Sequence, residues 1–217
     1  MLGESPDIIF MKSALFFTAL LASCFTFAFD TSDFSEPPAT YRLKQNYAKI
    51  DPQNQIREAS LRKALKFFEY NKAKTDNEHY MTLIDFSKPS GARRLFQIDM
   101  HTGKVLSMLV AAGRGSDENG DGRASEFSNE DGSHMSSLGF YLTGDEYEGE
   151  HGSSLRLFGL SRTNSNVLDR AIVIHGADYV TEDNAGRSFG CPAVSLKNVG
   201  PLIDRLKGGS LLYIFAD

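Results

Sequence analysis

The chain has 217 residues, a length that suits one domain with short additions. Hydrophobic residues make up 41% and charged residues 24%, both close to globular averages, so most of the chain is expected to fold around a core. The formal net charge of −5 provides no basic footprint, and we therefore expect no nucleic-acid partner.

Residues 1–28 have the pattern of an export signal peptide. Lys12 supplies a short positive region, the run Ala14–Phe27 is apolar, and Ala28 is a small residue at the expected cleavage point. The run is shorter than the about 20 apolar residues that a membrane span needs, so a retained anchor helix is the less favoured alternative. The segment predicts an exported protein of the periplasm or cell envelope, with no transmembrane span in the mature chain.

Two details of this segment leave alternatives open. The first ten residues carry acidic side chains, so Met11 fits the start of a signal better than the first methionine. The box Leu21–Cys24 resembles a lipoprotein signal, which would make Cys24 a lipid anchor, but the apolar run continues beyond it and favours cleavage after Ala28. Cleavage there leaves Cys191 as the one cysteine of a mature protein in an oxidising compartment. Such a thiol is either buried and inert, part of a disulfide to a partner, or reactive.

The remaining chain predicts a linker over 29–52 and one domain over 53–217. Apolar residues at helical spacing predict a helix over 53–73 that packs on this domain. Alternating or apolar runs bounded by turns predict strands at 80–86, 94–99, 105–112, 138–142, 155–160, 171–175 and 211–215, with a short helix over 198–207. Strands and helices do not alternate regularly, which argues against a doubly wound parallel sheet. We predict a mainly β fold with a few helices (α+β), mostly antiparallel and closed in part into a sandwich or barrel.

A long polar stretch at 113–137 interrupts the strands. Its segment Asp117–Gly122 matches the first half of a calcium loop, but Ser128 stands where the closing glutamate belongs. Asp, Asn and Gly are also ordinary turn residues, so we favour a turn and expect no metal.

The run from 171 to 195 carries the chemistry. His175 follows the apolar run Ala171–Ile174 and is predicted at the end of a strand, and Cys191 lies sixteen residues later, preceded by Gly190. An imidazole next to a thiol can take its proton, and as an ion pair it would lower the thiol pKa below about 8.5. Glycine permits a sharp bend that brings backbone amides toward an oxyanion. By spacing alone, a buried packing cysteine and a core histidine are equally compatible.

The same run resembles the YkuD-like L,D-transpeptidase catalytic domain, and its murein L,D-transpeptidase branch in particular. The shared motifs are a His-Gly strand end and a Ser-x-Gly-Cys sequence, here His175-Gly176 and Ser188–Cys191. Further agreeing segments are 84–90, 127–129, 136–139 and 187–193, so the resemblance covers the chain from about Tyr80 to its C-terminus.

The resemblance implies a YkuD-like fold, a catalytic Cys191 and a base His175 that is oriented by the carbonyl of Gly176. Gly190 and Phe189 would contribute backbone near the nucleophile; many relatives have histidine at the position of Phe189, so a side-chain role there is in doubt. Arg187 and Ser188 are candidate substrate contacts, because a guanidinium can bind a stem carboxylate, although a solvated loop cation is an equal alternative for the arginine.

The implied partner is a peptidoglycan stem peptide, and no cofactor is implied. The enzyme would cleave an L-to-D peptide bond, expel D-alanine and pass the acyl group to an amine of another stem; relatives also accept carbapenems. The alternatives are an L,D-carboxypeptidase with water as acceptor and a non-catalytic wall-binding module. A papain-like endopeptidase is disfavoured because its cysteine precedes its histidine.

Four further histidines lie in turns or polar stretches and receive no role here, namely His79, His101, His134 and His151.

Overall fold

The computed structural model describes residues 31–43 and 47–217. The predicted signal peptide and Cys24 lie outside these residues. Within them, no helix is both long and apolar enough to cross a membrane.

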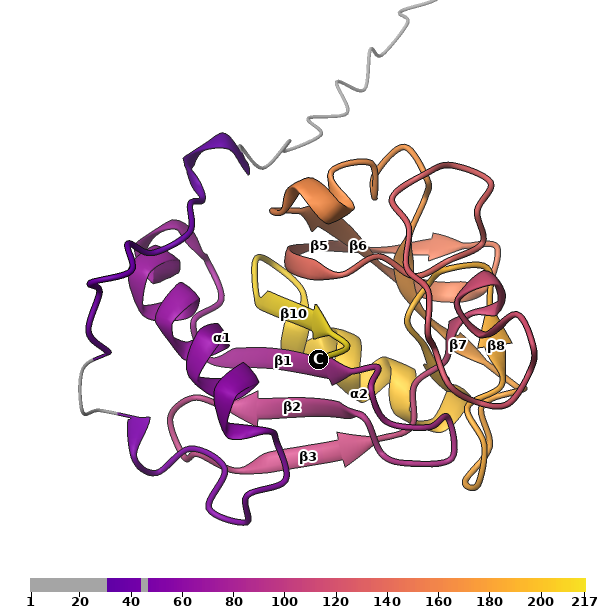
Figure 1. The fold of residues 1–217 in the computed structure, drawn as a ribbon, viewed down its shortest axis with the longest axis horizontal. Coiled ribbons are helices and arrows are strands. Elements are labelled where there is room, and N and C mark those ends of the chain that lie inside the picture. The colour runs from indigo at the N-terminus through magenta and orange to yellow at the C-terminus, as the bar shows by residue number, and fades with distance from the viewer. Residues whose placement is uncertain (1–30, 44–46) are drawn as a thin grey trace, which may run out of the picture.

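An eight-stranded sheet forms the centre of the domain (Figure 1). In spatial order its strands are β3 (Val105–Met108), β2 (Leu95–Asp99), β1 (Tyr80–Asp85), β10 (Leu211–Phe215), β5 (Gly139–Gly149), β6 (Gly152–Gly159), β7 (Val173–Ala177) and β9 (Ala193–Ser195). The pairs β1–β10 and β7–β9 are parallel, and the other neighbours are antiparallel.

The two edges of the sheet approach each other. Beyond β3, the backbone N–H of Ala111 donates to the carbonyl of Ala193 in β9 at 2.8 Å. A two-stranded sheet of β4 (Ala112–Gly113) and β8 (Arg187–Ser188) continues this contact. The predicted mainly β, partly closed fold is thereby confirmed.

Two helices cover opposite faces of the sheet: α1 (Glu58–Asn71) and α2 (Leu196–Leu206). Because side chains alternate along a strand, Met81 and Leu83 of β1 pack in the core on the α1 side, whereas Ile84 packs in the core on the α2 side. Helix α1 contributes Phe67, whose ring stacks on that of Phe140 in β5 with centroids 3.7 Å apart. Packing against the domain, as predicted for this helix, is confirmed. Short 3-10 turns occur at Thr31–Asp33, Lys72–Lys74, Arg114–Asp117 and Arg162–Asn164.

Several predicted boundaries are wrong, for local reasons. The first helix begins at Glu58 rather than 53, because the Asp51 carboxylate accepts the amides of Gln55 and Ile56 at 3.0 and 2.8 Å and holds them in a turn. The strand predicted at 138–142 runs on to 149 as a long hairpin with β6. The strand predicted at 171–175 begins at Val173.

Arg94 is the largest fully buried side chain, with 1% of its surface exposed. Its Nε donates to the carbonyl of Val110 at 2.9 Å and its Nη1 to that of Lys88 at 3.0 Å. Burial lowers the pKa of the guanidinium to about 10, against the opposing charges of Asp117 and Asp85, so the group stays cationic at neutral pH. Through these two bonds the buried cation joins the start of β2 to Lys88, which precedes it in the chain, and to Val110, which follows β3.

Candidate active site

The parallel pair β7–β9 brings the two predicted catalytic residues to adjacent strands. His175 is the register partner of Ala193, and Cys191 lies two residues before Ala193. The backbone N–H of Val173, two residues before His175, donates to the Cys191 sulfur at 3.5 Å. Strand register therefore closes the sixteen-residue gap between the histidine and the cysteine.

His175 lies in the middle of β7, not at its end as predicted, and is 3% exposed. The strand starts later because Ala171 is the last residue of a turn. It has a φ of 51°, and its backbone N–H donates to the carbonyl of Leu168 at 3.0 Å. The ring Nδ1 lies 2.9 Å from the carbonyl oxygen of Gly176. A carbonyl only accepts, so Nδ1 carries the proton and the lone pair of the neutral ring is on Nε2.

Gly176 also permits close packing behind the histidine. A Cβ at this position would lie 2.9 Å from Val199 Cγ1 and 3.1 Å from Leu196 Cδ2, both on α2. A larger residue would require the Val199 and Leu196 side chains to shift, so glycine here permits close packing against α2 as well as the carbonyl contact.

Burial shifts the pKa of both groups so that each favours its uncharged form. It lowers the pKa of His175, and the nearby His151 lowers it further, while the bond to Gly176 opposes them. It raises the pKa of Cys191, against the amide of Val173 and the charge of Arg170. Both shifts favour uncharged forms, which is the opposite of the pre-formed ion pair that the sequence suggested.

Ser188 shapes the turn that carries the nucleophile. Its Oγ donates to the carbonyl of Cys191 at 2.7 Å and accepts the amide of Gly190 at 3.1 Å. Gly190 has a φ of 123°, and a Cβ there would lie 2.9 Å from the carbonyl oxygen of Met135. Since the Gly190 amide is engaged, Phe189 and Cys191 are left to supply an amide to an oxyanion.

Phe189 projects from this turn with 61% of its surface exposed. The guanidinium carbon of Arg114 lies 4.4 Å above its ring, and the ring of His134 lies 4.9 Å from it. Phe189 thus forms part of an exposed aromatic and cationic rim next to the nucleophile, and its own phenyl side chain cannot act as a base.

Arg187 and the polar stretch 113–137 are joined by a structural contact. The Nη1 of Arg187 donates to the carbonyl of Asp117 at 2.8 Å. The Asp117 carboxylate accepts the amide of Gly122 at 3.2 Å, and that of Asp121 accepts the amide of Arg123 at 2.8 Å. These are turn contacts of the kind predicted for this segment.

Sequence reasoning missed three residues of the site. The ring of His151 stacks on His175 with centroids 4.3 Å apart. Arg170 donates from Nη2 to the Met135 carbonyl at 2.7 Å, and the Ser136 hydroxyl donates to the Gly190 carbonyl at 3.1 Å. Sequence patterns assigned none of them a role in the site, because their contacts there depend on how the strands and loops pack.

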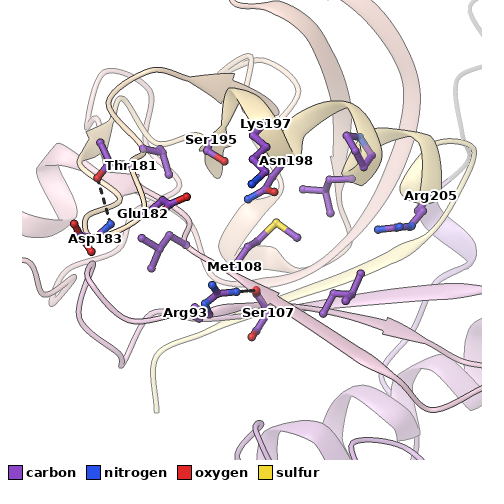
Figure 2. Close-up of a pocket in the computed structure, with 15 residues that line it drawn as sticks. Arg93, Ser107, Met108, Thr181, Glu182, Asp183, Ser195, Lys197, Asn198 and Arg205 are labelled. Carbon is purple, nitrogen blue, oxygen red and sulfur yellow. Dashed lines mark hydrogen bonds between the residues drawn. The ribbon is translucent and has the colours of Figure 1, made fainter.

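A separate cavity of about 640 Å³ lies between β3, α2 and the segment 180–183 (Figure 2). Arg93, Lys197 and Arg205 line it together with Glu182 and Asp183. Neither Cys191 nor His175 is among its lining residues, so it is distinct from the cysteine–histidine site.

Residues 52–215 match the family model of the L,D-transpeptidase catalytic domain. This match covers most of the chain, and the protein therefore belongs to that family, as the sequence resemblance predicted. Comparison with curated proteins gives no match.

Similar solved structures include an L,D-transpeptidase, LdtMt1, in complex with imipenem, at 12% identity and a TM-score of 0.40, covering 63% of this chain and 59% of that one. An L,D-transpeptidase from Mycobacterium smegmatis has 12% identity, a TM-score of 0.41 and coverages of 64% and 59%. The helical cell shape determining protein Pgp2 (K307A mutant) from Campylobacter jejuni has 15% identity, a TM-score of 0.43 and coverages of 66% and 49%. The chain thus spans about half to three fifths of the length of these structures.

Proposed function

We propose that the protein is a cysteine-dependent L,D-transpeptidase that acts on peptidoglycan stem peptides, with Cys191 as nucleophile and His175 as base. The observation that carries this proposal is the β7–β9 register, which sets the thiol beside the strand of a buried histidine whose Nδ1 is committed to the Gly176 carbonyl. The Nε2 lone pair is then the one available for the thiol proton.

In the acylation step, His175 Nε2 takes the proton of Cys191 as the sulfur attacks the carbonyl of the L-to-D bond. The tetrahedral oxyanion accepts a hydrogen bond from a backbone amide of the 188–191 turn. The imidazolium gives its proton to the departing D-alanine amine, which leaves a thioacyl-enzyme and a neutral histidine. An amine of a second stem then attacks the thioester and loses a proton to His175. The C–S bond breaks, and the imidazolium returns that proton to the sulfur, which restores the neutral Cys191 and His175.

Arg187 keeps guanidinium N–H groups beyond the one that it donates to Asp117, and we assign them to a carboxylate of the stem. Ser188 holds the turn through two bonds to backbone, so its proposed part is to orient Cys191 rather than to bind substrate directly.

The test is mass analysis of the purified protein with a defined tetrapeptide stem, with and without an amine acceptor. Release of D-alanine, a Cys191 adduct and a cross-linked product are expected, and Cys191→Ala should lose all three. Hydrolysis alone, even at high acceptor concentration, would identify a carboxypeptidase. Stem binding without any adduct in the parent protein would leave a wall-binding module.

The same experiment extends to imipenem. A solved L,D-transpeptidase is in complex with this carbapenem, and we propose that imipenem acylates Cys191 of the present protein. A mass increase in the parent that is absent from Cys191→Ala is the expected result.

The proposed location is the cell envelope, where the substrate lies. Export rests on the Lys12 and Ala14–Phe27 pattern, and N-terminal analysis of the envelope form should find a chain that starts at about Phe29 or a lipidated Cys24. An uncleaved cytoplasmic product would contradict export.

A further inference from the structure

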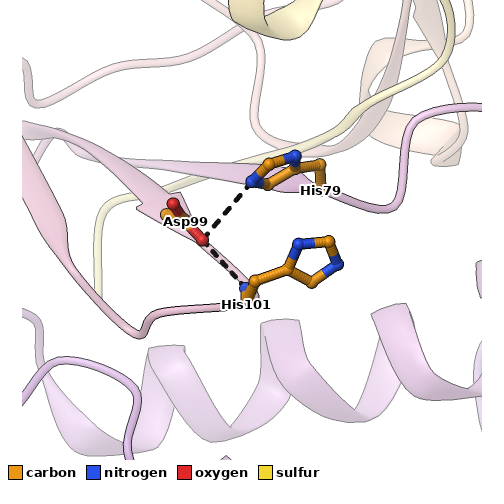
Figure 3. Close-up of side chains that lie close together, drawn as sticks. All are labelled: His79, Asp99 and His101. Atoms are coloured by element: carbon orange, nitrogen blue, oxygen red, sulfur yellow. Dashed lines mark hydrogen bonds and ion pairs between the residues drawn. The ribbon is translucent and has the colours of Figure 1, made fainter.

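Three side chains of types that can bind a metal ion lie close together at one end of the β1–β2 pair (Figure 3), and none of them belongs to the site of the proposed function. His79 directly precedes β1, Asp99 is the last residue of β2, and His101 lies in the turn that follows. The antiparallel register aligns Tyr80 with Asp99, and this alignment brings His79 beside the carboxylate.

The spacing of the three groups suits one small cation. One potential ligand atom from each residue lies within 4.8 Å of the other two. His79 Nε2 and Asp99 Oδ1 are 3.5 Å apart. Tetrahedral zinc with bonds of about 2.1 Å holds its ligands about 3.4 Å apart. The 3.5 Å separation of this pair is already close to the spacing of zinc ligands.

The surroundings hold these side chains in position. Asp99 Oδ1 accepts the backbone amides of His101 and Thr102, both at 2.9 Å. The ring of His79 stacks on that of Tyr80 at 4.3 Å with an interplanar angle of 1°. Supporting contacts of this kind orient metal ligands.

We propose that His79, Asp99 and His101 form a binding site for a divalent transition-metal ion of the zinc type. Two imidazoles and one carboxylate are a donor set that such ions accept, and the exposed side of the site leaves a fourth position for water. A bound ion joins the start of β1 to the turn after β2. That turn also receives the backbone amide of Asp51 at the Gly103 carbonyl (3.1 Å), so the metal would strengthen the attachment of the N-terminal segment.

Calorimetric titration with Zn²⁺ tests the site in the full chain. All variants carry Cys24→Ser and Cys191→Ser, because thiolates bind zinc strongly and would add competing sites. We expect one ion per chain, a higher Tm with Zn²⁺ than without it, and affinity at least about tenfold weaker in His79→Ala and in His101→Ala. These readouts do not depend on activity, so their failure leaves the proposed function untouched.

Two further variants sharpen the result. Asp99→Asn keeps an oxygen for the two turn amides but removes the carboxylate charge, so it should weaken zinc while the metal-free Tm stays near the parent value. His134→Asn removes an imidazole elsewhere, at a φ of 53° that asparagine tolerates, and should bind as the parent does. Three results would each overturn the site. They are no zinc binding in the parent, binding as tight as the parent's in both His79→Ala and His101→Ala, or a loss of affinity in His134→Asn as large as in those two variants.

Discussion

Replacing His175 by glutamine distinguishes two ways in which it could activate Cys191. In a pre-formed ion pair, the imidazolium keeps the thiol ionised at neutral pH, and its removal returns the thiol to the neutral form. In the structure, burial raises the pKa of Cys191 and lowers that of His175, so both groups rest uncharged. The imidazole then takes the proton only as the sulfur attacks.

The magnitude follows from the titration. A thiol with the ordinary pKa of about 8.5 is about 3% ionised at pH 7, and burial makes the fraction for Cys191 smaller still. Iodoacetamide should therefore alkylate the parent more slowly at neutral pH than it alkylates a free cysteine peptide. Its rate should rise with a midpoint on the alkaline side of that peptide.

Glutamine at position 175 can still donate to the Gly176 carbonyl and fill most of the buried volume. We expect the alkylation profile of His175→Gln to stay close to that of the parent, while acyl transfer falls by about 10²–10⁴-fold through loss of the base. Phe189→Ala is the matched control, because its ring is 61% exposed and carries no base; it should change neither profile by much. Rapid parent alkylation at neutral pH that disappears in His175→Gln would refute the neutral resting pair.

Three other substitutions test the frame around the site. Arg94→Met removes the hydrogen bonds to the buried Val110 carbonyl and the part-buried Lys88 carbonyl, and should lower the free energy of unfolding by about 1–3 kcal/mol in urea denaturation. An unchanged free energy of unfolding would contradict this. Gly190→Ala puts a side chain at a φ of 123° and 2.9 Å from the Met135 carbonyl, and should cost at least about 1–2 kcal/mol and most of the acyl transfer. Ser188→Ala should keep the fold, as checked by Tm, but slow acyl transfer about tenfold, because the Cys191 carbonyl loses the hydrogen bond from the serine hydroxyl. Unchanged turnover would show that the turn holds Cys191 in place without this bond.

Residue chemistry and short-range pattern identified much of this protein. Alternating or apolar runs bounded by turns located the strands from 80 to 99 and the last strand at 211–215, whose side chains pack against the two separate cores. The motif residues around His175 and Cys191 indicated the family that the match over 52–215 then confirmed. Two- and three-residue strands such as β8 and β9 escaped, since so short a run carries no period.

What only the tertiary structure decided is how these residues act on one another. The chemical types of Cys191 and His175 can be read from the chain, but their alignment depends on the parallel register of β7 with β9, a long-range pairing with no local signature. The same holds for Arg170 and His151, whose contacts with the site depend on packing and have no signature in the sequence. The direction of both pKa shifts depends on burial, and burial is a property of the packed core around a residue rather than of the residue itself.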